Sequence, residues 1–130
     1  MIRFWIKRKK RADERYHRAS LWLSPMIDKV MKDKEPYLDA DFCLDRLCKM
    51  VGSNRSYVSY ALKEKDTNFL KMVRDYRCRY VEKLVRGRPH GYDLDDIAYI
   101  SGFPSKRAML KSLKHHYFRI YIMVRMSVKK

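Results

Sequence analysis

The chain has 130 residues and a mass of 15.8 kDa, which leaves room for one domain or two very small ones and argues against a large enzyme core. Its formal net charge is +16, yet 46% of its residues are hydrophobic, so we expect a folded chain with a cationic exterior and not a disordered basic tail. A polyanion is the expected partner: double-stranded DNA first, and a membrane surface second.

The cysteines bear on the compartment. Cys43, Cys48 and Cys78 are odd in number and show no paired spacing, and no secretory signal precedes them. We therefore expect free thiols and a reduced, cytoplasmic setting. No uninterrupted apolar run is long enough to span a bilayer.

Residues 1–23 are predicted as a basic N-terminal helix or linker. Phe4, Trp5 and Ile6 are followed by five consecutive cations, "KRKKR", a pattern that resembles the cytoplasmic flank of a membrane span. Because the span itself is absent, a solvated basic segment is favoured, with membrane proximity as the alternative. A three-four spacing of apolar residues also leaves open a short dimerising coil.

Helical patterns become clearer from Ser24 onward. Ser24 and Pro25 read as an N-cap and a first helical position, and this helix is expected to end near Pro36. The next pattern, "FCLDRLCKMVG", stops at Gly52, and Asn54 can cap the helix that follows. Its inward face is predicted to comprise Tyr57, Val58, Ala61 and Leu62.

The second half of the chain repeats this arrangement. A long helix is expected over 69–85, and "RGRPHG" ends it. Asp93 is the predicted cap of "LDDIAYIS", Gly102 supplies a positive-φ exit, Phe103 plugs the bend, and Ser105 caps the final pattern. Leu47, Cys48 and Gly52 correspond to Ile97, Ala98 and Gly102 at an offset of 50, and Asn54, Val58 and Leu62 to Ser105, Met109 and Leu113 at an offset of 51.

The repeat predicts an all-α fold: two tandem helix-turn-helix subdomains joined by a long linker helix. The polar side chains after each turn lie where a recognition helix meets DNA, although a solvated helix face is the alternative for each. The candidate DNA-binding residues are Asn54, Arg55, Ser56, Ser59, Tyr60 and Lys63 in the first copy, and Ser105, Lys106, Arg107, Lys111 and Lys114 in the second.

The two copies and their linker resemble the DNA-binding domain of the AraC/XylS family of transcription regulators. The resemblance covers roughly 37–117, and its most specific parts are "DLDDIAYISGFPS" and "FLKMVRDYRCRYVEKLV", with Arg77 at the family's linker arginine position. It implies a bilobed helical DNA-binding domain over 24–117 that has no cofactor and places its recognition helices in successive major grooves. Members of the family usually carry a sensing or dimerising domain on the N-terminal side. We therefore expect either a small stand-alone regulator or the output end of a longer protein with such a sensor, either free or tethered to a membrane.

The chain departs from the family pattern in several places. Asp66 stands where the family usually has glycine, Cys43 replaces a Ser or Thr cap, and Val81 replaces an alanine. The family's "G-x-T-P-x-x-Y-R" is replaced by "FRIYIMVR", so 118–130 is predicted as an atypical apolar and basic tail. Its strand-prone residues, Ile120, Tyr121, Ile122 and Val124, put the family's last helix in question.

Catalytic and metal-binding interpretations are weaker. The potential metal ligands Cys43, Cys48, His115 and His116 have no ligand spacing. The acids Asp45, Asp95 and Asp96 begin helices, where the helix dipole favours them. We therefore predict no enzyme, no metal and no cofactor, but a sequence-specific transcription regulator. The alternative is a helical protein-interaction module whose helix-turn-helix fold no longer binds DNA.

Overall fold

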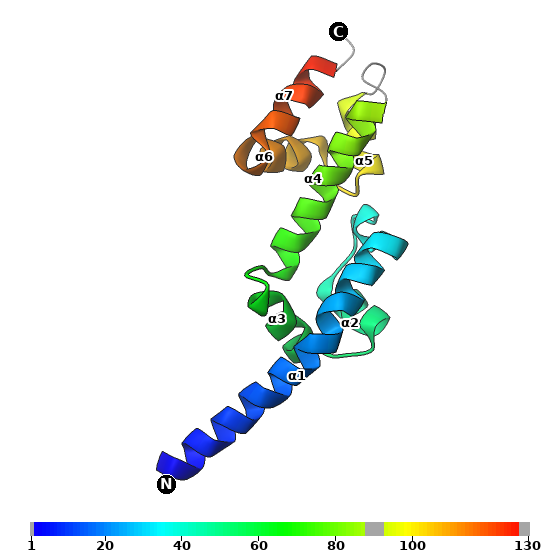
Figure 1. The fold of residues 1–130 in the computed structure, drawn as a ribbon. Coiled ribbons are helices and arrows are strands. Elements are labelled where there is room, and N and C mark those ends of the chain that lie inside the picture. Colours follow the sequence, from blue (N-terminus) through cyan, green and yellow to red (C-terminus); the bar gives the residue numbers. More distant parts are fainter. Residues whose placement is uncertain (1, 88–92, 128–130) are drawn as a thin grey trace. The chain divides into compact units, whose positions relative to one another are not determined.

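A computed structural model describes residues 2–87 and 93–127. These residues are helical or lie in short connections, and they contain no strand (Figure 1). In chain order the elements are α1 (Ile2–Lys34), the short 3₁₀ helix η1 (Pro36–Leu38), α2 (Leu44–Val51), α3 (Arg55–Glu64), α4 (Phe69–Gly87), α5 (Leu94–Ile100), α6 (Lys106–His116) and α7 (Phe118–Ser127). The predictions of an all-α fold and of a long helix from residue 69 are confirmed.

The described residues divide into two compact units. The first contains 2–35 and 43–69, and the second contains 36–42, 70–87 and 93–127. The chain therefore passes from one unit to the other three times. Segment 36–42, which separates α1 from α2 in the sequence, belongs to the second unit.

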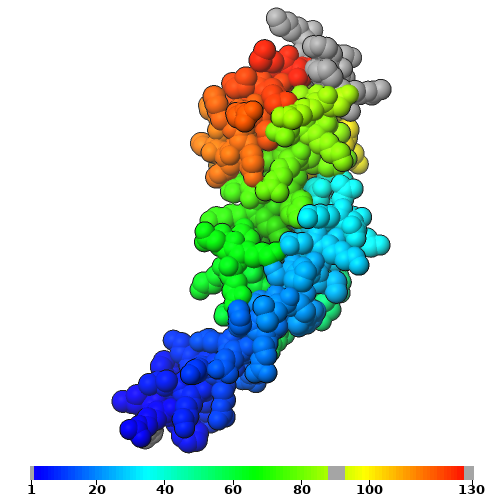
Figure 2. All heavy atoms as spheres, viewed as in Figure 1, coloured from blue at the N-terminus to red at the C-terminus, as the bar shows by residue number. Residues whose placement is uncertain are grey.

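In the first unit α1 packs against α2 and α3. Its buried residues, Ser20, Leu23, Ile27 and Met31, recur every three or four positions and so share one face. They meet the apolar faces of the two shorter helices, formed by Leu47, Cys48, Val51, Val58, Ala61 and Leu62. None of residues 2–11 is buried, and Figure 2 shows the first half of α1, in dark blue, extending beyond α2 and α3.

The helix predicted to begin at Ser24 and Pro25 is instead part of α1, which runs through Pro25 without a break. Proline removes one backbone donor from a helix and costs about 3 kcal/mol in its interior. The buried face extends on both sides of Pro25, from Ser20 to Met31, so its packing outweighs that loss. The boundary predicted between residues 23 and 24 consequently falls inside a helix.

The turn between α2 and α3 follows the local chemistry of its residues. Gly52 has φ 71°, and its N–H donates to the Lys49 carbonyl, as expected of a glycine helix exit. The Asn54 side chain accepts a hydrogen bond from the Tyr57 N–H at 3.0 Å, which confirms the predicted cap. Cys43 occupies the N-cap position of α2 but makes no capping bond with its side chain.

In the second unit the second half of α4 shares a core with α5, α6 and α7. The buried members of that core are Cys78, Val81, Val85, Leu94, Ile97, Ala98, Phe103, Met109, Leu113, Ile120 and Val124. Phe103 is buried at the bend, and Ser105 accepts from the Ala108 N–H at 3.0 Å, both as predicted. Asp93 stands at the N-cap of α5 without a side-chain capping bond, so that predicted bond is absent.

The predicted tail is helical over Phe118–Ser127, so the strand preference read from its sequence was misleading; its last three residues lie outside the described ranges. A strand would place Ile120, Ile122 and Val124 on one face. In α7, Ile120 and Val124 are buried one turn apart, while Ile122 is exposed. Burial at the helical spacing overrides the modest β-propensity of branched and aromatic residues.

Segment 36–42 is held to the second unit through its backbone. Arg77 of α4 donates from Nε to the Tyr37 carbonyl at 2.7 Å and from Nη2 to the Asp39 carbonyl at 3.0 Å. Partial burial lowers the pKa of Arg77 from its ordinary value. The Tyr37 ring also contacts the Tyr76 ring, with centroids 5.1 Å apart.

Gly102 makes this approach possible. It has φ 84°, and a Cβ added there would lie 2.2 Å from the Tyr37 carbonyl oxygen and 2.8 Å from the Leu38 backbone. Gly52 has a similar φ, 71°, but a Cβ there would meet nothing within 4 Å. Gly52 is therefore needed only for its positive φ, whereas Gly102 is needed both for its positive φ and because no side chain fits there.

We expect Gly102→Ala to destabilise the protein more than Gly52→Ala. Each substitution forces an L residue into the left-handed region, at about 1 to 2 kcal/mol. Gly102→Ala must also displace the backbone at Tyr37 and Leu38, at a further cost of about 1 to 3 kcal/mol. Urea denaturation of both variants measures the difference, and equal losses would contradict the steric role of Gly102.

The two buried serines should respond oppositely to alanine. Ser101 Oγ is buried and has no hydrogen-bond partner among residues 2–87 and 93–127, whereas Ser20 Oγ lies 2.7 Å from both the His17 carbonyl oxygen and Glu64 Oε2. Ser101→Ala removes an unsatisfied group and should raise the free energy of unfolding by about 1 kcal/mol, while Ser20→Ala should lower it by a similar amount. Thermal and urea unfolding test this, and a destabilising Ser101→Ala would indicate a partner for that hydroxyl.

Candidate nucleic-acid interface

The most strongly charged candidate surface is the outer face of α6. Met109 and Leu113 anchor its inner face in the core. The cations of the same helix, Lys106, Arg107, Lys111 and Lys114, are exposed. None of these cations forms an ion pair with a carboxylate in residues 2–87 and 93–127. Together with three neighbours they line an open groove, whose residues are Lys106, Arg107, Leu110, Lys111, Lys114, His115 and Tyr121.

Tyr121 joins this groove from α7 and was not among the binding residues predicted from the sequence. Its ring lies under the Arg125 guanidinium, 5.6 Å from the ring centroid, and a hydrogen bond from Arg125 lowers the pKa of Tyr121. The signal that was available is the four-residue spacing of Ile120 and Val124, which predicts a helix and would have placed Tyr121 beside α6.

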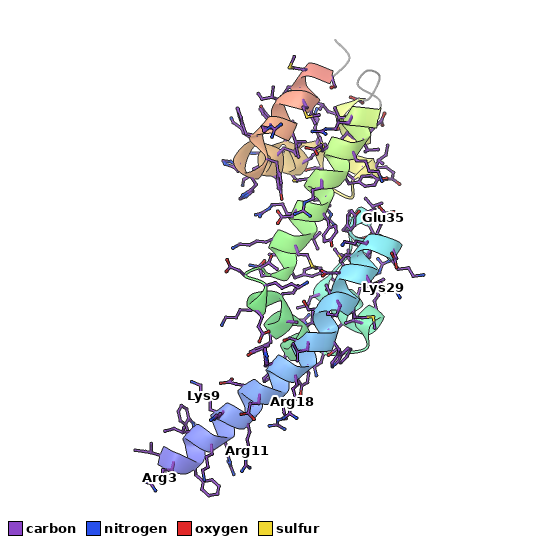
Figure 3. The ribbon with its side chains drawn as sticks, in the orientation of Figure 1. Arg3, Lys9, Arg11, Arg18, Lys29 and Glu35 are labelled. Carbon is purple, nitrogen blue, oxygen red and sulfur yellow. The ribbon has the colours of Figure 1, made fainter. Side chains whose placement is uncertain are left out.

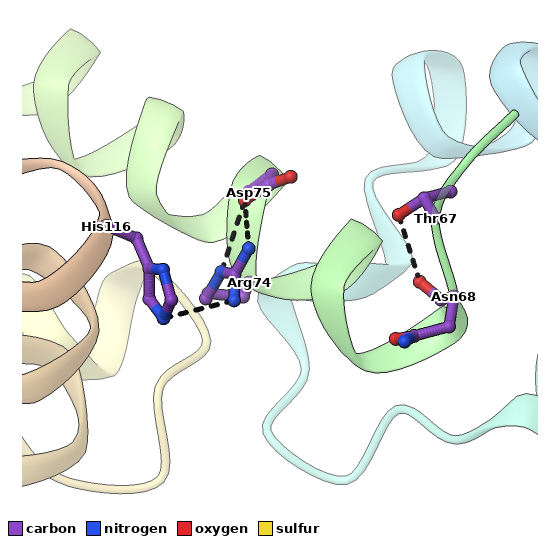
Figure 4. A network of polar contacts seen from close by, with 5 residues as sticks. All are labelled: Thr67, Asn68, Arg74, Asp75 and His116. Atoms are coloured by element: carbon purple, nitrogen blue, oxygen red, sulfur yellow. Dashed lines mark hydrogen bonds and ion pairs between the residues drawn. The ribbon is translucent and has the colours of Figure 1, made fainter.

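The neighbouring histidines occupy different environments. His115 lines the groove, whereas His116 Nε2 lies 3.2 Å from Arg74 Nη1 of α4 (Figure 4). A guanidinium can only donate, so this contact requires an unprotonated Nε2 on His116. Arg74 also donates to Asp75 Oδ1 at 3.1 Å. The pKa of Tyr117 is raised to about 12, mainly by burial and to a smaller extent by a hydrogen bond to Asp75.

The outer face of α3 carries less free charge than its sequence suggests. Ser56, Ser59 and Lys63 are exposed, as predicted. Arg55 is exposed too, but it makes a two-pronged ion pair with Asp45 of α2, through Nε–Oδ1 at 2.5 Å and Nη2–Oδ2 at 2.9 Å. The hydrogen bond from Arg55 lowers the pKa of Asp45. Asp45 therefore does more than complement the dipole of its own helix.

Tyr60 was predicted on the outer face of α3, but it is half-buried against α1. Its ring stacks on Tyr16, with centroids 5.3 Å apart, and Tyr16 also contacts the Tyr57 ring at 4.8 Å. Burial, together with a hydrogen bond to Glu64, raises the pKa of Tyr60. The aromatic residues of α3 thus join it to α1 rather than presenting a stacking surface to solvent.

Asn54 and Ser105 start the two candidate helices. Their side-chain oxygens cap the helix backbone, from the Tyr57 N–H and the Ala108 N–H respectively. The structure therefore gives both residues a structural task. Of the predicted residues, it gathers Lys106, Arg107, Lys111 and Lys114 on one groove and leaves Ser56, Ser59 and Lys63 exposed on α3.

The described residues offer little for other chemistries. In 2–87 and 93–127 no three His, Cys, Asp or Glu side chains are grouped to hold a metal ion. Cys43 is exposed, while burial raises the pKa of Cys48 and brings that of Cys78 to about 12. No helix in these ranges combines the length and the apolar character needed to cross a membrane.

Comparison with protein-family models, with curated proteins and with solved structures finds no match for this chain. Its functional interpretation consequently rests on the sequence pattern and on the geometry of the two candidate helices.

The contact between α1 and α3 should make the first unit sensitive to acid. Glu64 accepts from His17 Nδ1 at 2.9 Å and lies 2.7 Å from Ser20 Oγ, and these hydrogen bonds lower the pKa of Glu64 below its ordinary value of 4.5. A carboxylate whose pKa is lower in the folded state stabilises the fold above its unfolded pKa, and that stability is lost as the pH falls through the folded pKa.

We therefore expect the melting temperature of the wild-type protein to fall more steeply below pH 4.5 than that of Glu64→Gln, which has no carboxylate to titrate. Circular dichroism melts between about pH 6 and pH 3 give both curves. Parallel curves would show that ionised Glu64 does not stabilise the contact between α1 and α3.

Proposed function

We propose that the chain is a sequence-specific DNA-binding transcription regulator of the AraC/XylS type. In this proposal α2 and α3 form one helix-turn-helix unit, α5 and α6 form a second, and α4 is the linker helix. The recognition helices α3 and α6 enter successive major grooves of double-stranded DNA. The observation that carries the proposal is a set of four exposed cations on α6, directly after a capped turn: Lys106, Arg107, Lys111 and Lys114. None of them pairs with a carboxylate among the described residues.

The chemistry of that surface fits a duplex. Each Lys or Arg that neutralises a phosphate releases condensed counterions, which supplies most of the sequence-independent affinity. An arginine in the major groove can donate two hydrogen bonds to the O6 and N7 atoms of guanine. Arg107 is exposed within the first turn of α6, and the first residues of a recognition helix are those that reach base edges.

The two helices would contribute differently. The free cations of α6 supply attraction to phosphates, whereas α3 offers mainly the neutral hydroxyls of Ser56 and Ser59, because Asp45 holds Arg55. Hydroxyls can bond phosphates or base edges but add no net charge. We therefore assign most of the salt-dependent affinity to the second unit.

A helical protein-interaction module remains the second candidate, and α7 gives a specific reason to keep it. Phe118, Ile122 and Met126 lie at four-residue intervals and are 57%, 41% and 78% exposed. Apolar anchors with that spacing suit a groove on a protein partner. The partner could be the sensing or dimerising domain that regulators of this kind carry. The free cysteines suit a cytoplasmic location for either candidate function.

Duplex binding as a function of salt separates the two candidates. We expect wild-type affinity for duplex DNA to fall steeply with salt. In Arg107→Gln/Lys111→Gln the logarithmic slope should shrink by about 1, because Lys111 loses a phosphate contact. Loss of the Arg107 contact to guanine should lower the affinity for the preferred sequence further. The matched control is Arg79→Gln/Lys83→Gln, which removes the same two residue types, at the same spacing, from exposed positions of α4.

The control should retain nearly the wild-type slope and affinity in the same anisotropy titrations. Equal losses in the two double variants would mean that diffuse positive charge, and not the α6 groove, attracts the duplex. Absence of duplex binding even at low salt would reject the proposed function in favour of the interaction module.

A further inference from the structure

The first unit carries a row of arginines that the proposed recognition helices do not use. Arg8, Arg11, Arg15 and Arg18 recur at intervals of three and four residues, and we call this row the arginine face of α1. At 3.6 residues per turn, its four positions fall within an arc of about 80°. At 1.5 Å per residue, they extend over roughly 15 Å of the helix axis.

The arginine face takes no part in the packing of the fold. All four side chains are exposed, and the buried residues of α1 point in a different direction around the helix. None of the four arginines pairs with a carboxylate in the described ranges, although Glu14 lies beside them and the Arg8 guanidinium stacks over the Phe4 ring. Like charges at this spacing destabilise a helix, so the fold itself gives no reason for the row.

The arginine face extends toward the start of α3, the proposed recognition helix of the first unit. Arg8, Arg11, Arg15 and Arg18 line one depression with Glu14. Arg15 and Arg18 line a second depression as well, together with Ala19, Trp22, Gly52, Ser53, Asn54 and Tyr57. The positive surface therefore continues from α1 to the turn that begins α3. Figure 3 shows Arg11 and Arg18 on one side of α1 and Lys9 on the other.

We propose that the arginine face of α1 binds the sugar–phosphate backbone of duplex DNA beside the groove that α3 enters. This inference rests on the proposed function and adds a backbone-binding surface to it. A guanidinium presents a planar fork of donors that matches two phosphate oxygens. Over roughly 15 Å of its axis a duplex carries about nine phosphate charges, which is ample for four arginines. The site on DNA is therefore longer than two recognition helices require.

The distribution of apolar residues argues for DNA rather than a lipid surface as the partner. A helix that lies on a membrane buries a face rich in Trp, Phe or Leu, and its Lys and Arg residues lie on the opposite, polar face. In the first half of α1 the exposed residues Ile2, Trp5 and Ile6 project away from the arginine face on the helical wheel. Phe4, also exposed, lies on the arginine face, where the Arg8 guanidinium covers its ring. Vesicle binding, if it occurs, would thus use the opposite side of α1.

Two triple variants test the proposal on the full chain. Arg8→Gln/Arg11→Gln/Arg15→Gln neutralises the arginine face, while Arg3→Gln/Lys9→Gln/Lys10→Gln removes three charges from other sides of the same helix. Each is titrated with duplexes of about two and four helical turns. Circular dichroism melts verify that both variants fold as the wild type does.

We expect the wild type to bind the longer duplex more tightly and with a steeper salt dependence. The arginine variant should lose that advantage, with a slope lower by about two to three, whereas the control variant should lose at most about one. If both variants lose the same slope and affinity, the arginine face is not a defined site and the inference is wrong, although the proposed function stands.

Two further outcomes complete the test. If the wild type binds no duplex at any salt concentration, the proposed function fails, and this inference with it. If the wild type binds vesicles of phosphatidylserine and phosphatidylcholine, and only the arginine variant loses that binding, the face belongs to lipid and the inference is overturned. Vesicle binding that survives in the arginine variant, together with its loss on the long duplex, supports the assignment to DNA.

Discussion

The second unit depends on the contact between the Arg77 guanidinium and two backbone carbonyls of segment 36–42. A backbone carbonyl that is removed from water needs a hydrogen-bond donor. Arg77 supplies one N–H group to each of the two carbonyls. The same segment lies against Gly102, where a side chain would collide with its backbone. Three stretches that are distant in the sequence thus fix one another: the segment, α4 and the turn before α6.

The first unit has a different organisation, because α1 covers one side of α3. Tyr57, Tyr60 and Glu64 all face α1, and only a narrow polar strip of α3 remains free. Asp45 further withdraws Arg55 from that strip. The helices α3 and α6 are therefore alike in their caps and turns, but α3 presents less net positive charge to solvent than α6. Equivalent positions in an internal repeat need not perform equivalent tasks.

Features decided by neighbouring residues were predictable from the sequence. Asn54 and Ser105 cap their helices, both turn glycines adopt positive φ, and Phe103 fills its bend. Features decided by distant residues were not. Continuity through Pro25 depends on packing against α2 and α3, the helicity of residues 118–127 depends on the core beneath them, and the burial of Tyr60 depends on Tyr16. The tandem helix-turn-helix arrangement and its DNA ligand remain predictions.

The charge of α1 has a consequence for how salt acts on the protein. The first turn of the helix contains Arg3 and no acid, so a cation stands at the positive end of the helix dipole, and the arginines that follow repel one another. Residues 2–11 bury no side chain that would offset these effects. Added salt screens the repulsion and favours the helical form, yet the same ions compete for any polyanion it binds. The helix content at this end of α1 would therefore rise with ionic strength while its affinity for a polyanion would fall.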